Sequence, residues 1–564
     1  MISKIKKIII NKGLDGYIVP KNDKFFTEYS KINNLELVSN FSGSAGFAII
    51  LRNKNYLFVD GRYTIQAKKQ AGKNFKIFEI PLIWPRNIFE SSKNKFNLGF
   101  DPKLFTYNSL KNYFSNTCNL SPINEDLFNK KSNKNLDKKK FYKLDEKITG
   151  ESSNSKINRV IKILNKKKID YLFVSAGENV CWLMNIRGKD LPNSPVANCN
   201  IILTKDRKIY FFSKFNKVSK IKKKFINQKV FFYGEEKLFE ILRSIKPGSF
   251  CIDKLTCSIF NEEIIKSNFI IKERSDFIYY LKSIKNKTEI KNMMKTHIED
   301  GVALTKFLHW IKNIKKLNLT EKQVEKKLEN YRKQNKNYLY PSFDTIAGSG
   351  PNGAIIHYRS NKQSNRKLNI KDLLLIDSGG QYKWGTTDVT RTICFSKVRK
   401  QIKRLFTRVL KGHIAVAQSN IKYEKIGHNI DKKARQSLKK VGLDYRHGTG
   451  HGVGFFLNVH EGPQSISKNN YIKLEEGMVV SNEPGYYLEN KFGIRIENLV
   501  FIKKIEKKLC FENLTFAPID RDLIDVKMLT NNEKNYLFNY HLETYSKISP
   551  FLNKTQKKWL AKLI

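Results

Sequence analysis

Apolar and polar residues alternate along the first half of the chain in a way that predicts short buried strands between helices. Up to about residue 145, β-forming runs such as Gly46–Leu51 and Tyr56–Val59 are separated by helix-like stretches. A comparable alternation begins near Ile157, includes the strand-like run Tyr171–Val174, and continues to about Tyr280. Both stretches are therefore predicted to be α/β in character.

The two α/β stretches are separated by a polar, lysine-rich segment from Asn129 to Lys140, which is predicted to be a linker. Their similar texture favours two related α/β domains, which we place at residues 1–145 and 146–283. The remaining residues, 284–564, have a different pattern and are predicted to form a third domain.

The third domain is predicted to open with a long amphipathic helix, because apolar residues recur every three or four positions. These residues are Ile290, Met293, Met294, Ile298, Val302, Phe307, Leu308 and Ile311. Two further helices are predicted from capping boxes, one starting at Thr320 with Gln323 and one at Thr530 with Glu533. Between them the chain becomes rich in Gly, His, Asp and β-forming residues.

The strong net positive charge of the chain raises the question of an anionic partner. The 564 residues include 105 Lys and Arg against 52 Asp and Glu, a formal net charge of +53. Such an excess is compatible with nucleic acid or an anionic membrane surface as a partner. The lysines are scattered along the whole chain, however, which favours a lysine-rich background composition. We therefore expect neither a membrane nor a nucleic acid as the main partner.

Cysteine usage and the N-terminus bear on the compartment. The seven cysteines are an odd number without a CxxC pair, which favours free thiols in a reducing compartment. The basic N-terminal run is too short for a secretory signal, and no stretch approaches the roughly 20 apolar residues of a membrane helix. A cytoplasmic location is expected.

Two aspartates in the last third of the chain carry the first chemical signal. Asp377 ends the apolar run 373–376, which is predicted to be a buried strand, and Asp388 lies in the next β-prone run. Their spacing fits an antiparallel hairpin that brings the two carboxylates together. Buried carboxylates that face each other repel, and a metal cation between them is the natural compensation.

Three further residues extend this set, namely His451, Glu483 and Glu497. Arg495 and Glu497 are predicted to share one face of a final strand. Four carboxylates with one imidazole suit two divalent ions better than one structural zinc. The alternating glycines of residues 447–454 exclude an HExxH helix, and they permit a strand that a substrate backbone approaches closely.

Each of these residues has an ordinary structural explanation when it is taken alone. An Asp at a strand end is usually a turn former or a cap, a His in a glycine-rich loop usually lies at the surface, and an Arg–Glu pair is usually structural. Their clustering within about 140 residues favours the metal site.

Five segments of the chain resemble the motif set of the creatinase/aminopeptidase P family, whose catalytic domain has the pita-bread fold. They are residues 347–358, 373–392, 447–463, 481–487 and 493–498. The resemblance identifies Asp377, Asp388, His451, Glu483 and Glu497 as metal ligands. It also implies that Glu483 acts as general base, that His357, His447 and His460 have catalytic and substrate-binding roles, and that Arg495 binds substrate.

The resemblance covers nearly the whole chain. Residues 40–46 and 60–63 look like the family's N-terminal domain, and residues 182–188 look like its middle domain. The tail from Ile524 to His541 resembles the C-terminal extension of the long, three-domain cytosolic members, here about residues 510–564. Trp384 departs from the family pattern, where a small or acidic residue is expected, but it is not a ligand position.

The expected protein therefore has an α/β (α+β) fold, with two creatinase-N-like domains and a pita-bread catalytic domain. The resemblance implies Xaa-Pro aminopeptidase activity, which removes the first residue from peptides whose second residue is proline. It implies two divalent ions per subunit, with Mn(II) expected and Zn(II) or Co(II) as alternatives, and a homodimer. Two alternatives remain open, a prolidase restricted to Xaa-Pro dipeptides and a non-catalytic pita-bread protein that binds nucleic acid or histones.

Overall fold

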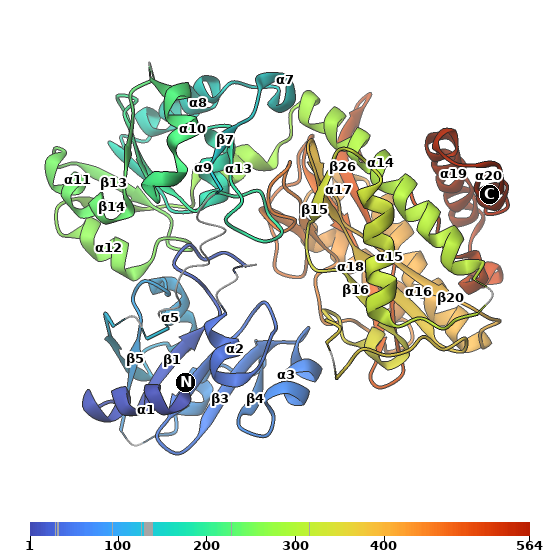
Figure 1. Cartoon of the computed structure of the whole chain (residues 1–564), viewed down its shortest axis with the longest axis horizontal. Helices are drawn as coiled ribbons and strands as arrows, with labels where there is room; N and C mark the ends of the chain where they lie inside the picture. The colour runs from blue at the N-terminus through green and yellow to red at the C-terminus, as the bar shows by residue number, and fades with distance from the viewer. Residues whose placement is uncertain are drawn as a thin grey trace. The chain divides into compact units, whose positions relative to one another are not determined.

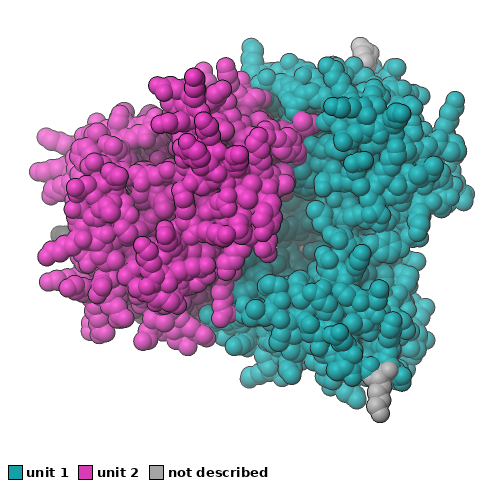
Figure 2. All heavy atoms as spheres, turned by 180° about the vertical axis from the view of Figure 1, so that it is seen from behind, with its two compact units in different colours: residues 1–279 teal, residues 280–564 magenta. Residues whose placement is uncertain are grey.

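The structure is a computed structural model of the chain. It describes residues 1–28, 30, 33–92, 94–125, 127–128, 139–226, 228–314, 316–361 and 363–564. These residues form two compact units, Met1–Tyr279 and Tyr280–Ile564, which Figure 2 colours separately. Residues 129–138 of the predicted linker lie outside the described residues. Among the described residues, no helix has both the length and the apolar character needed to cross a bilayer.

The first half of unit 1 is built on a six-stranded sheet with the order β4-β3-β2-β1-β5-β6. The central pairs β1–β2 and β2–β3 are antiparallel, and the outer pairs are parallel. The elements are α1 (Ile2–Asn11), β1 (Gly16–Pro20), α2 (Asn34–Ser39), β2 (Phe47–Leu51), β3 (Asn55–Asp60), α3 (Thr64–Ala71), β4 (Lys76–Ile80), α4 (Pro85–Phe89), β5 (Phe96–Phe100), α5 (Tyr107–Phe114) and β6 (Cys118–Pro122).

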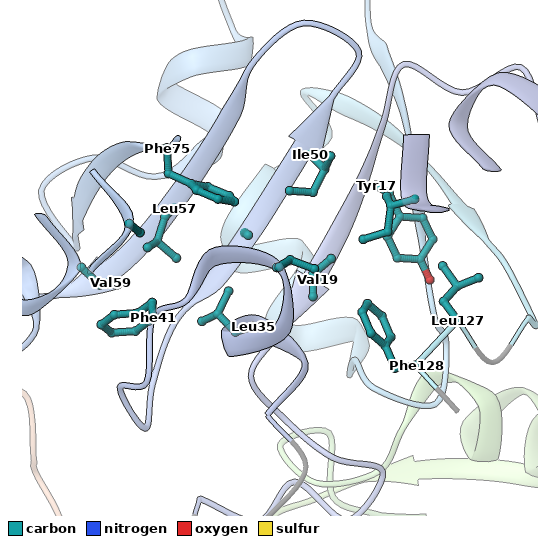
Figure 3. Close-up of a cluster of buried hydrophobic side chains, with 14 of the residues drawn as sticks. Tyr17, Val19, Leu35, Phe41, Ile50, Leu57, Val59, Phe75, Leu127 and Phe128 are labelled. Atoms are coloured by element: carbon teal, nitrogen blue, oxygen red, sulfur yellow. The ribbon is translucent and has the colours of Figure 1, made fainter. Parts of the chain in front are cut away.

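Both faces of this sheet are buried, which explains why its central strands are continuous apolar runs. Tyr17 and Val19 of β1 point into one hydrophobic cluster with Leu35 and Ile50 (Figure 3). Ile18, between them, belongs to the cluster on the opposite face. Because successive side chains of a strand point to opposite faces, a sheet covered on both sides needs apolar residues at every position.

The second half of unit 1 repeats this topology. Its six-stranded sheet has the order β12-β11-β10-β8-β13-β14, with the same pattern of parallel and antiparallel pairs. The elements are β7 (Tyr142–Lys143), α7 (Glu146–Thr149), α8 (Ser153–Lys166), β8 (Tyr171–Val174), α9 (Gly177–Leu183), β9 (Ile186–Arg187), β10 (Asn200–Thr204), β11 (Ile209–Phe212), α10 (Ser219–Lys222), β12 (Val230–Tyr233), α11 (Leu238–Ser244), β13 (Ser249–Ile252), α12 (Ile259–Lys266) and β14 (Ile270–Glu273).

Two helices of unit 2, labelled α15 (Glu321–Lys333) and α19 (Asn531–Ile548) in Figure 1, begin at the predicted capping boxes. The long helix α14 (Lys287–Lys312) buries Met293, Phe307 and Ile311. Thr320 and Thr530 form capping boxes at the first turns of α15 and α19. The other α-helices are α16 (Lys400–Ala417), α17 (Ile421–Glu424), α18 (Gly427–Lys439) and α20 (Lys554–Ala561), and the boundary between the two units falls within α13 (Phe277–Ser283).

The strands of unit 2 carry the residues of the predicted site. They form the sheets β15-β18-β19, β16-β17-β20, β22-β21-β23-β26-β27 and β24-β25. The strands are β15 (Tyr338–Pro341), β16 (Ile346–Ser349), β17 (Leu373–Ser378), β18 (Gly380–Tyr382), β19 (Gly385–Thr386), β20 (Val389–Cys394), β21 (Gly450–Gly452), β22 (Glu461–Ile466), β23 (Val479–Asn482), β24 (Gly485–Leu488), β25 (Phe492–Arg495), β26 (Asn498–Ile505) and β27 (Lys508–Asn513).

Candidate metal centre

The two predicted aspartates lie on a pair of antiparallel strands, as their spacing indicates. Asp377 is in β17 and pairs with Thr390 of β20, while Asp388 immediately precedes β20. Asp388 is two residues from Thr390, and side chains two residues apart in an extended chain share a face. Both carboxylates are buried, with Asp377 8% and Asp388 4% exposed. The short β18–β19 hairpin lies between the two strands and carries the half-buried Trp384 in its turn.

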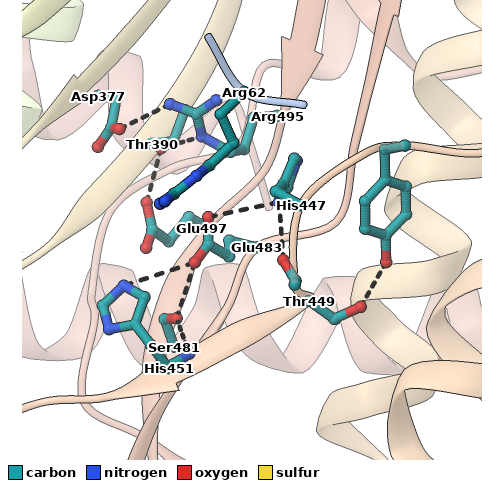
Figure 4. A network of polar contacts seen from close by, with 12 residues as sticks. Arg62, Asp377, Thr390, His447, Thr449, His451, Ser481, Glu483, Arg495 and Glu497 are labelled. Carbon is teal, nitrogen blue, oxygen red and sulfur yellow. Dashed lines mark hydrogen bonds and ion pairs between the residues drawn. The ribbon is translucent and has the colours of Figure 1, made fainter. Parts of the chain in front are cut away.

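Three of the five predicted ligands converge on one point. The ligand atoms of Asp388, His451 and Glu497 all lie within 4.8 Å of one another. His451 Nε2 is 3.5 Å from Asp388 Oδ2. It is also 3.5 Å from Glu483 Oε1, so Glu483, the fourth predicted ligand, contacts the group through the imidazole (Figure 4). Asp388 directly precedes β20 and His451 lies in β21. Glu483 directly follows β23, and Glu497 lies in the link between β25 and β26.

The position of Glu497 differs from the predicted geometry in one detail. Arg495 and Glu497 are not in one strand, because β25 ends at Arg495 and β26 begins at Asn498. The break is stabilised by β20: Glu497 N donates to the carbonyl oxygen of Thr390 at 3.2 Å, and Thr390 Oγ1 donates to Glu497 Oε2 at 2.6 Å. The predicted alternation survives, since Ile494 and Ile496 both enter the hydrophobic core.

The ionisation of these groups is strongly perturbed by burial and by their closeness to one another. Burial and the neighbouring Asp377 carboxylate raise the pKa of Asp388 to about 6. Burial, with Asp388 and Glu483, raises the pKa of Glu497 well above its usual value. Burial acts to lower the pKa of His451, but the Asp388 and Glu483 carboxylates raise it to about 9. A divalent cation between the carboxylates would relieve this repulsion.

Unpartnered oxygens in the cluster fit the same interpretation. Among the described residues, the buried oxygens Asp377 Oδ1 and Asp388 Oδ1 have no hydrogen-bond partner. An unsatisfied buried carboxylate oxygen is costly, and such oxygens are the ligands that divalent cations take. Four carboxylates and one imidazole therefore form a donor set that fits two divalent ions.

The glycines around His451 let neighbouring strands approach closely. A Cβ atom at Gly450 would lie 1.9 Å from the carbonyl oxygen of Ser481, so only glycine allows β21 to pack against β23 at this point. Ser481 Oγ then accepts from His451 N at 2.9 Å and donates to Glu483 Oε1 at 3.1 Å. The sequence predicted a substrate backbone next to these glycines, whereas at Gly450 the close approach is made by the chain's own strand β23.

A chain of hydrogen bonds connects Asp377, one of the predicted metal ligands, to His447. Arg495 Nη2 donates to Asp377 Oδ2 at 2.6 Å, and Nη1 donates to Tyr487 Oη at 2.7 Å. Tyr487 Oη lies 2.9 Å from His447 Nε2, and His447 Nδ1 lies 3.9 Å from Glu483 Oε2. Sequence reasoning did not assign Tyr487 a role. Its position four residues after Glu483, in the same glycine- and proline-containing segment, was the available signal.

The other two predicted histidines occupy different surroundings. The ring of His460 is 4.3 Å from that of His451, centroid to centroid, which places it beside the metal cluster. His357 follows the short helical segment Gly350–Ala354, which contacts β17 and β25. The structure thus brings His447, His451 and His460 together. It carries His357 just after a segment that packs against β17, which bears Asp377, and against β25, which bears Arg495.

The segment that carries His357 is held by the carboxylate of Glu321, which is fully buried at the start of α15. Glu321 accepts from Ser349 N at 2.8 Å, from Tyr358 Oη at 2.6 Å and from Arg366 N at 2.9 Å. It also accepts from Asn352 Nδ2 at 3.0 Å. One carboxylate therefore holds the segment at both ends and on each side of His357.

A second cluster that could bind a metal ion already has a cationic partner. The ligand atoms of Cys394, Asp520 and Asp522 lie within 4.8 Å of one another. The ammonium group of Lys312 lies 2.9 Å from a carboxylate oxygen of each aspartate. The chain itself therefore supplies one positive charge against the two carboxylates of this cluster.

Comparison with known proteins assigns the whole chain to four family regions. Residues 1–127 and 132–289 match two models of the creatinase/prolidase N-terminal domain. Residues 291–504 match metallopeptidase family M24, and residues 507–563 match the C-terminal region of that peptidase. A probable Xaa-Pro aminopeptidase P from Laccaria bicolor is 36% identical, with 98% of this chain and 90% of that protein covered.

The chain belongs to the Xaa-Pro aminopeptidase family of M24 metallopeptidases. The crystal structure of X-prolyl aminopeptidase from Caenorhabditis elegans, described as a cytosolic enzyme with a di-nuclear active site, has a TM-score of 0.92 at 28% identity. That match covers 100% of this chain and 98% of the other. Prolidase from Pyrococcus furiosus has a TM-score of 0.51 at 27% identity, covering 63% of this chain and 98% of the other.

These family matches also confirm the predicted fold class. Two α/β domains of the creatinase N-terminal type precede an M24 domain, which has the pita-bread fold. The identical strand orders of the two N-terminal sheets give the structural basis for the predicted relationship between these domains.

Proposed function

We propose that this Xaa-Pro aminopeptidase family member releases the N-terminal residue from peptides whose second residue is proline. The observation that carries the proposal is the convergence of Asp388, His451 and Glu497 within 4.8 Å in a chain that matches an X-prolyl aminopeptidase over its full length. The chain is accordingly a metallo-aminopeptidase, a hydrolase of peptide bonds.

The proposed metal ligands are the five residues Asp377, Asp388, His451, Glu483 and Glu497. Asp388 and Glu497 would be ligands at the centre of the site, because each contributes to the central group and each is almost fully buried. Asp377 is held by Arg495 through one oxygen, which leaves its other oxygen for an ion. We propose two divalent ions per subunit, of which Mn(II) is the expected metal.

The proposed mechanism is hydrolysis assisted by a general base. Two divalent ions, when bound, supply a Lewis acid and a water molecule of lowered pKa. Glu483 is the least buried carboxylate of the set, and it takes the proton of the attacking water and returns it to the departing nitrogen. His357 and His460 stabilise the charge that develops on the scissile carbonyl oxygen.

His447, which is proposed to bind substrate, is held in place by Tyr487. Tyr487 holds His447 Nε2 at 2.9 Å, and it is itself fixed by Arg495, so both side chains have defined positions. A proline nitrogen carries no N–H, and its ring fixes φ. A site that recognises the second residue by its shape, rather than by an N–H group, therefore accepts proline.

The remaining parts of the proposal concern organisation and location. We propose domain boundaries at residues 1–145, 146–283 and 284–564, the last including a C-terminal extension from about residue 510. A homodimer and a cytoplasmic location are proposed as well. The solved relative from Caenorhabditis elegans, described as a cytosolic enzyme, supports the location.

Prolidase is the rival activity within this family, and substrate length separates the two. The purified chain, stripped with a chelator and reloaded with Mn²⁺, is given Ala-Pro, Ala-Pro-Ala and Ala-Ala-Ala. We expect release of alanine from Ala-Pro-Ala and no cleavage of Ala-Ala-Ala. Cleavage of Ala-Pro alone would make the chain a prolidase. A lack of hydrolysis with any divalent metal would favour the non-catalytic alternative, and a gel-shift assay at physiological salt would then test nucleic-acid binding.

A further inference from the structure

The guanidinium group of Arg391 links the backbone of a proposed metal ligand to the C-terminal part of the chain. Arg391 lies in β20, only 2% exposed. Its Nη1 donates to the carbonyl oxygen of Glu497 at 2.6 Å and to that of Thr390 at 2.8 Å. Because Thr390 Oγ1 also holds the Glu497 carboxylate, both the backbone and the side chain of Glu497 are held by two successive residues of one strand.

The other side of the same guanidinium group contacts the C-terminal region. Arg391 Nε donates to Pro518 O at 2.9 Å, and Nη2 donates to Ala517 O at 2.7 Å and to Tyr540 Oη at 2.9 Å. Nη2 also donates to Asn498 Oδ1 at 2.8 Å. Three acceptors thus lie within residues 291–504, which match family M24, and three lie within residues 507–563, which match its C-terminal region.

Neutral groups hold this buried charge. Among the described residues no carboxylate forms an ion pair with Arg391, and its acceptors are carbonyl, amide and hydroxyl oxygens. A buried cation held in this way depends on every acceptor being in place. Tyr540, on α19, supplies one acceptor and positions another, because its hydroxyl group donates to Ala517 O at 2.7 Å. The next residue, His541, accepts from Ile519 N at 3.1 Å and fixes the same strand-like segment.

We infer that α19 is part of the support of the metal centre, with Tyr540 acting through Arg391 to fix the position of Glu497 and so to set the affinity for divalent ions. Tyr540 is a positioning residue in this account and touches neither metal nor substrate. The inference rests on the ligand assignment under the proposed function. It gives a role to the Asn539-Tyr540-His541 segment, which the hydrolytic mechanism leaves unused.

The test compares Tyr540→Phe with Tyr545→Phe in the full-length chain. Tyr545 lies on the same helix, and within the described part of the chain no hydrogen bond from its hydroxyl group is found. Each protein is stripped with a chelator and titrated with Mn²⁺ in a calorimeter. Loss of an outer hydrogen bond to a metal ligand typically weakens binding by about 10- to 100-fold. Because Tyr540 acts one hydrogen bond further out, through Arg391, we expect the lower end of this range, an approximately 10-fold higher Kd for one of the two ions in Tyr540→Phe, and an unchanged Kd in Tyr545→Phe.

A spectroscopic readout separates positioning from general stability. Reloading with Co²⁺ reports the ligand geometry through its visible absorption. We expect the Co²⁺ spectrum to change in Tyr540→Phe and to match wild type in Tyr545→Phe, even where both variants unfold at similar temperatures. If Tyr540→Phe does not fold, Arg391→Lys replaces it. A single ammonium group cannot contact both sides, so the same loss of affinity is expected.

Two results would overturn the inference, and they are distinguishable from failure of the function. If wild type binds two ions and Tyr540→Phe binds them with the same Kd and Co²⁺ spectrum, α19 does not support the centre. If Tyr545→Phe loses affinity equally, the effect belongs to the stability of α19 and not to Arg391. If wild type itself binds no divalent ion, the ligand assignment fails, and this inference fails with it.

Discussion

The guanidinium group of Arg495 lies between Asp377 and Tyr487, 2.6 Å from the carboxylate oxygen Oδ2 and 2.7 Å from the phenolic oxygen. It thereby occupies one oxygen of a proposed metal ligand, and the other, Oδ1, has no hydrogen-bond partner among the residues that the structure describes. The same arginine orients the tyrosine that contacts His447. A single buried residue, 1% exposed, thus connects the metal side of the site to its substrate side.

Tyr487→Phe should lower kcat while leaving the fold intact. The phenyl ring preserves the packing, but His447 Nε2 and Arg495 Nη1 both lose their contact with the hydroxyl group. Removal of such an orienting hydrogen bond typically costs about 10- to 100-fold in activity. We expect this loss to appear mainly in kcat for a Xaa-Pro-Yaa tripeptide in steady-state kinetics. Tyr486→Phe, at the neighbouring position, is the control, and equal kinetics for the two variants would contradict the assigned role.

Glu321→Gln should loosen the segment that carries His357. The glutamine amide has one acceptor oxygen in place of two. Its NH₂ group faces either the donors Ser349 N and Asn352 Nδ2 or the donors Arg366 N and Asn352 Nδ2, depending on which oxygen it replaces. Each unsatisfied buried group costs about 1–3 kcal/mol. We expect a loss of about 2 kcal/mol in the free energy of unfolding, measured in urea, and a reduced kcat/KM.

Glu329→Gln is the matched control for this change. Glu329 lies two turns further along α15 and forms a surface ion pair with Lys333. Exposed pairs of this kind contribute little, so this variant should keep both the stability and the activity of wild type. Comparable losses in Glu321→Gln and Glu329→Gln would show that Glu321 has no special role in holding the segment.

The pH dependence of stability should include a large contribution from His541. Burial, with the nearby Arg391, lowers the pKa of His541 to about 3, against about 6.5 in an unfolded chain. The unfolded chain therefore binds more protons below pH about 6.5. The stability contributed by neutral His541 is present above that pH and is lost as the pH falls towards 3.

His541→Gln keeps an acceptor for Ile519 N but cannot be protonated. Between pH 7 and pH 5 we expect wild type to lose about 2 kcal/mol more unfolding free energy than this variant. Urea unfolding at the two pH values measures the difference. An equal loss in both proteins would mean that His541 is not held neutral in the folded state. His413, whose pKa is also lowered to about 3 by burial, contributes equally to both proteins and cancels.

Much of the fold could be predicted because local signals agreed with the final structure. The capping boxes at Thr320 and Thr530 mark the starts of α15 and α19, and the run Tyr171–Val174 is strand β8. Within the site, the spacing of Asp377 and Asp388 gave the antiparallel pairing. Each of these features depends on a short stretch of sequence, because hydrophobic periodicity and helix capping involve residues that are close together in the chain.

The rest depended on contacts between distant segments. Arg391 and Tyr540 are separated by 149 positions in sequence, and no local pattern indicates that they share a hydrogen bond. The split between β25 and β26 at Glu497 was also missed, because the alternation of Ile494 and Ile496 is the same in one strand as in two. Tertiary packing decides which segment forms backbone hydrogen bonds with a residue such as Glu497, and the local sequence does not.

The central claim is tested most directly by release of the first residue from a Xaa-Pro-Yaa tripeptide. Wild type and Glu483→Ala are each stripped with a chelator, reloaded with Mn²⁺, and compared by product analysis. The account predicts release by reloaded wild type, no release by the stripped protein, and a loss of activity of at least about 100-fold in Glu483→Ala. Equal hydrolysis by Glu483→Ala and wild type, or hydrolysis that needs no metal, would contradict it.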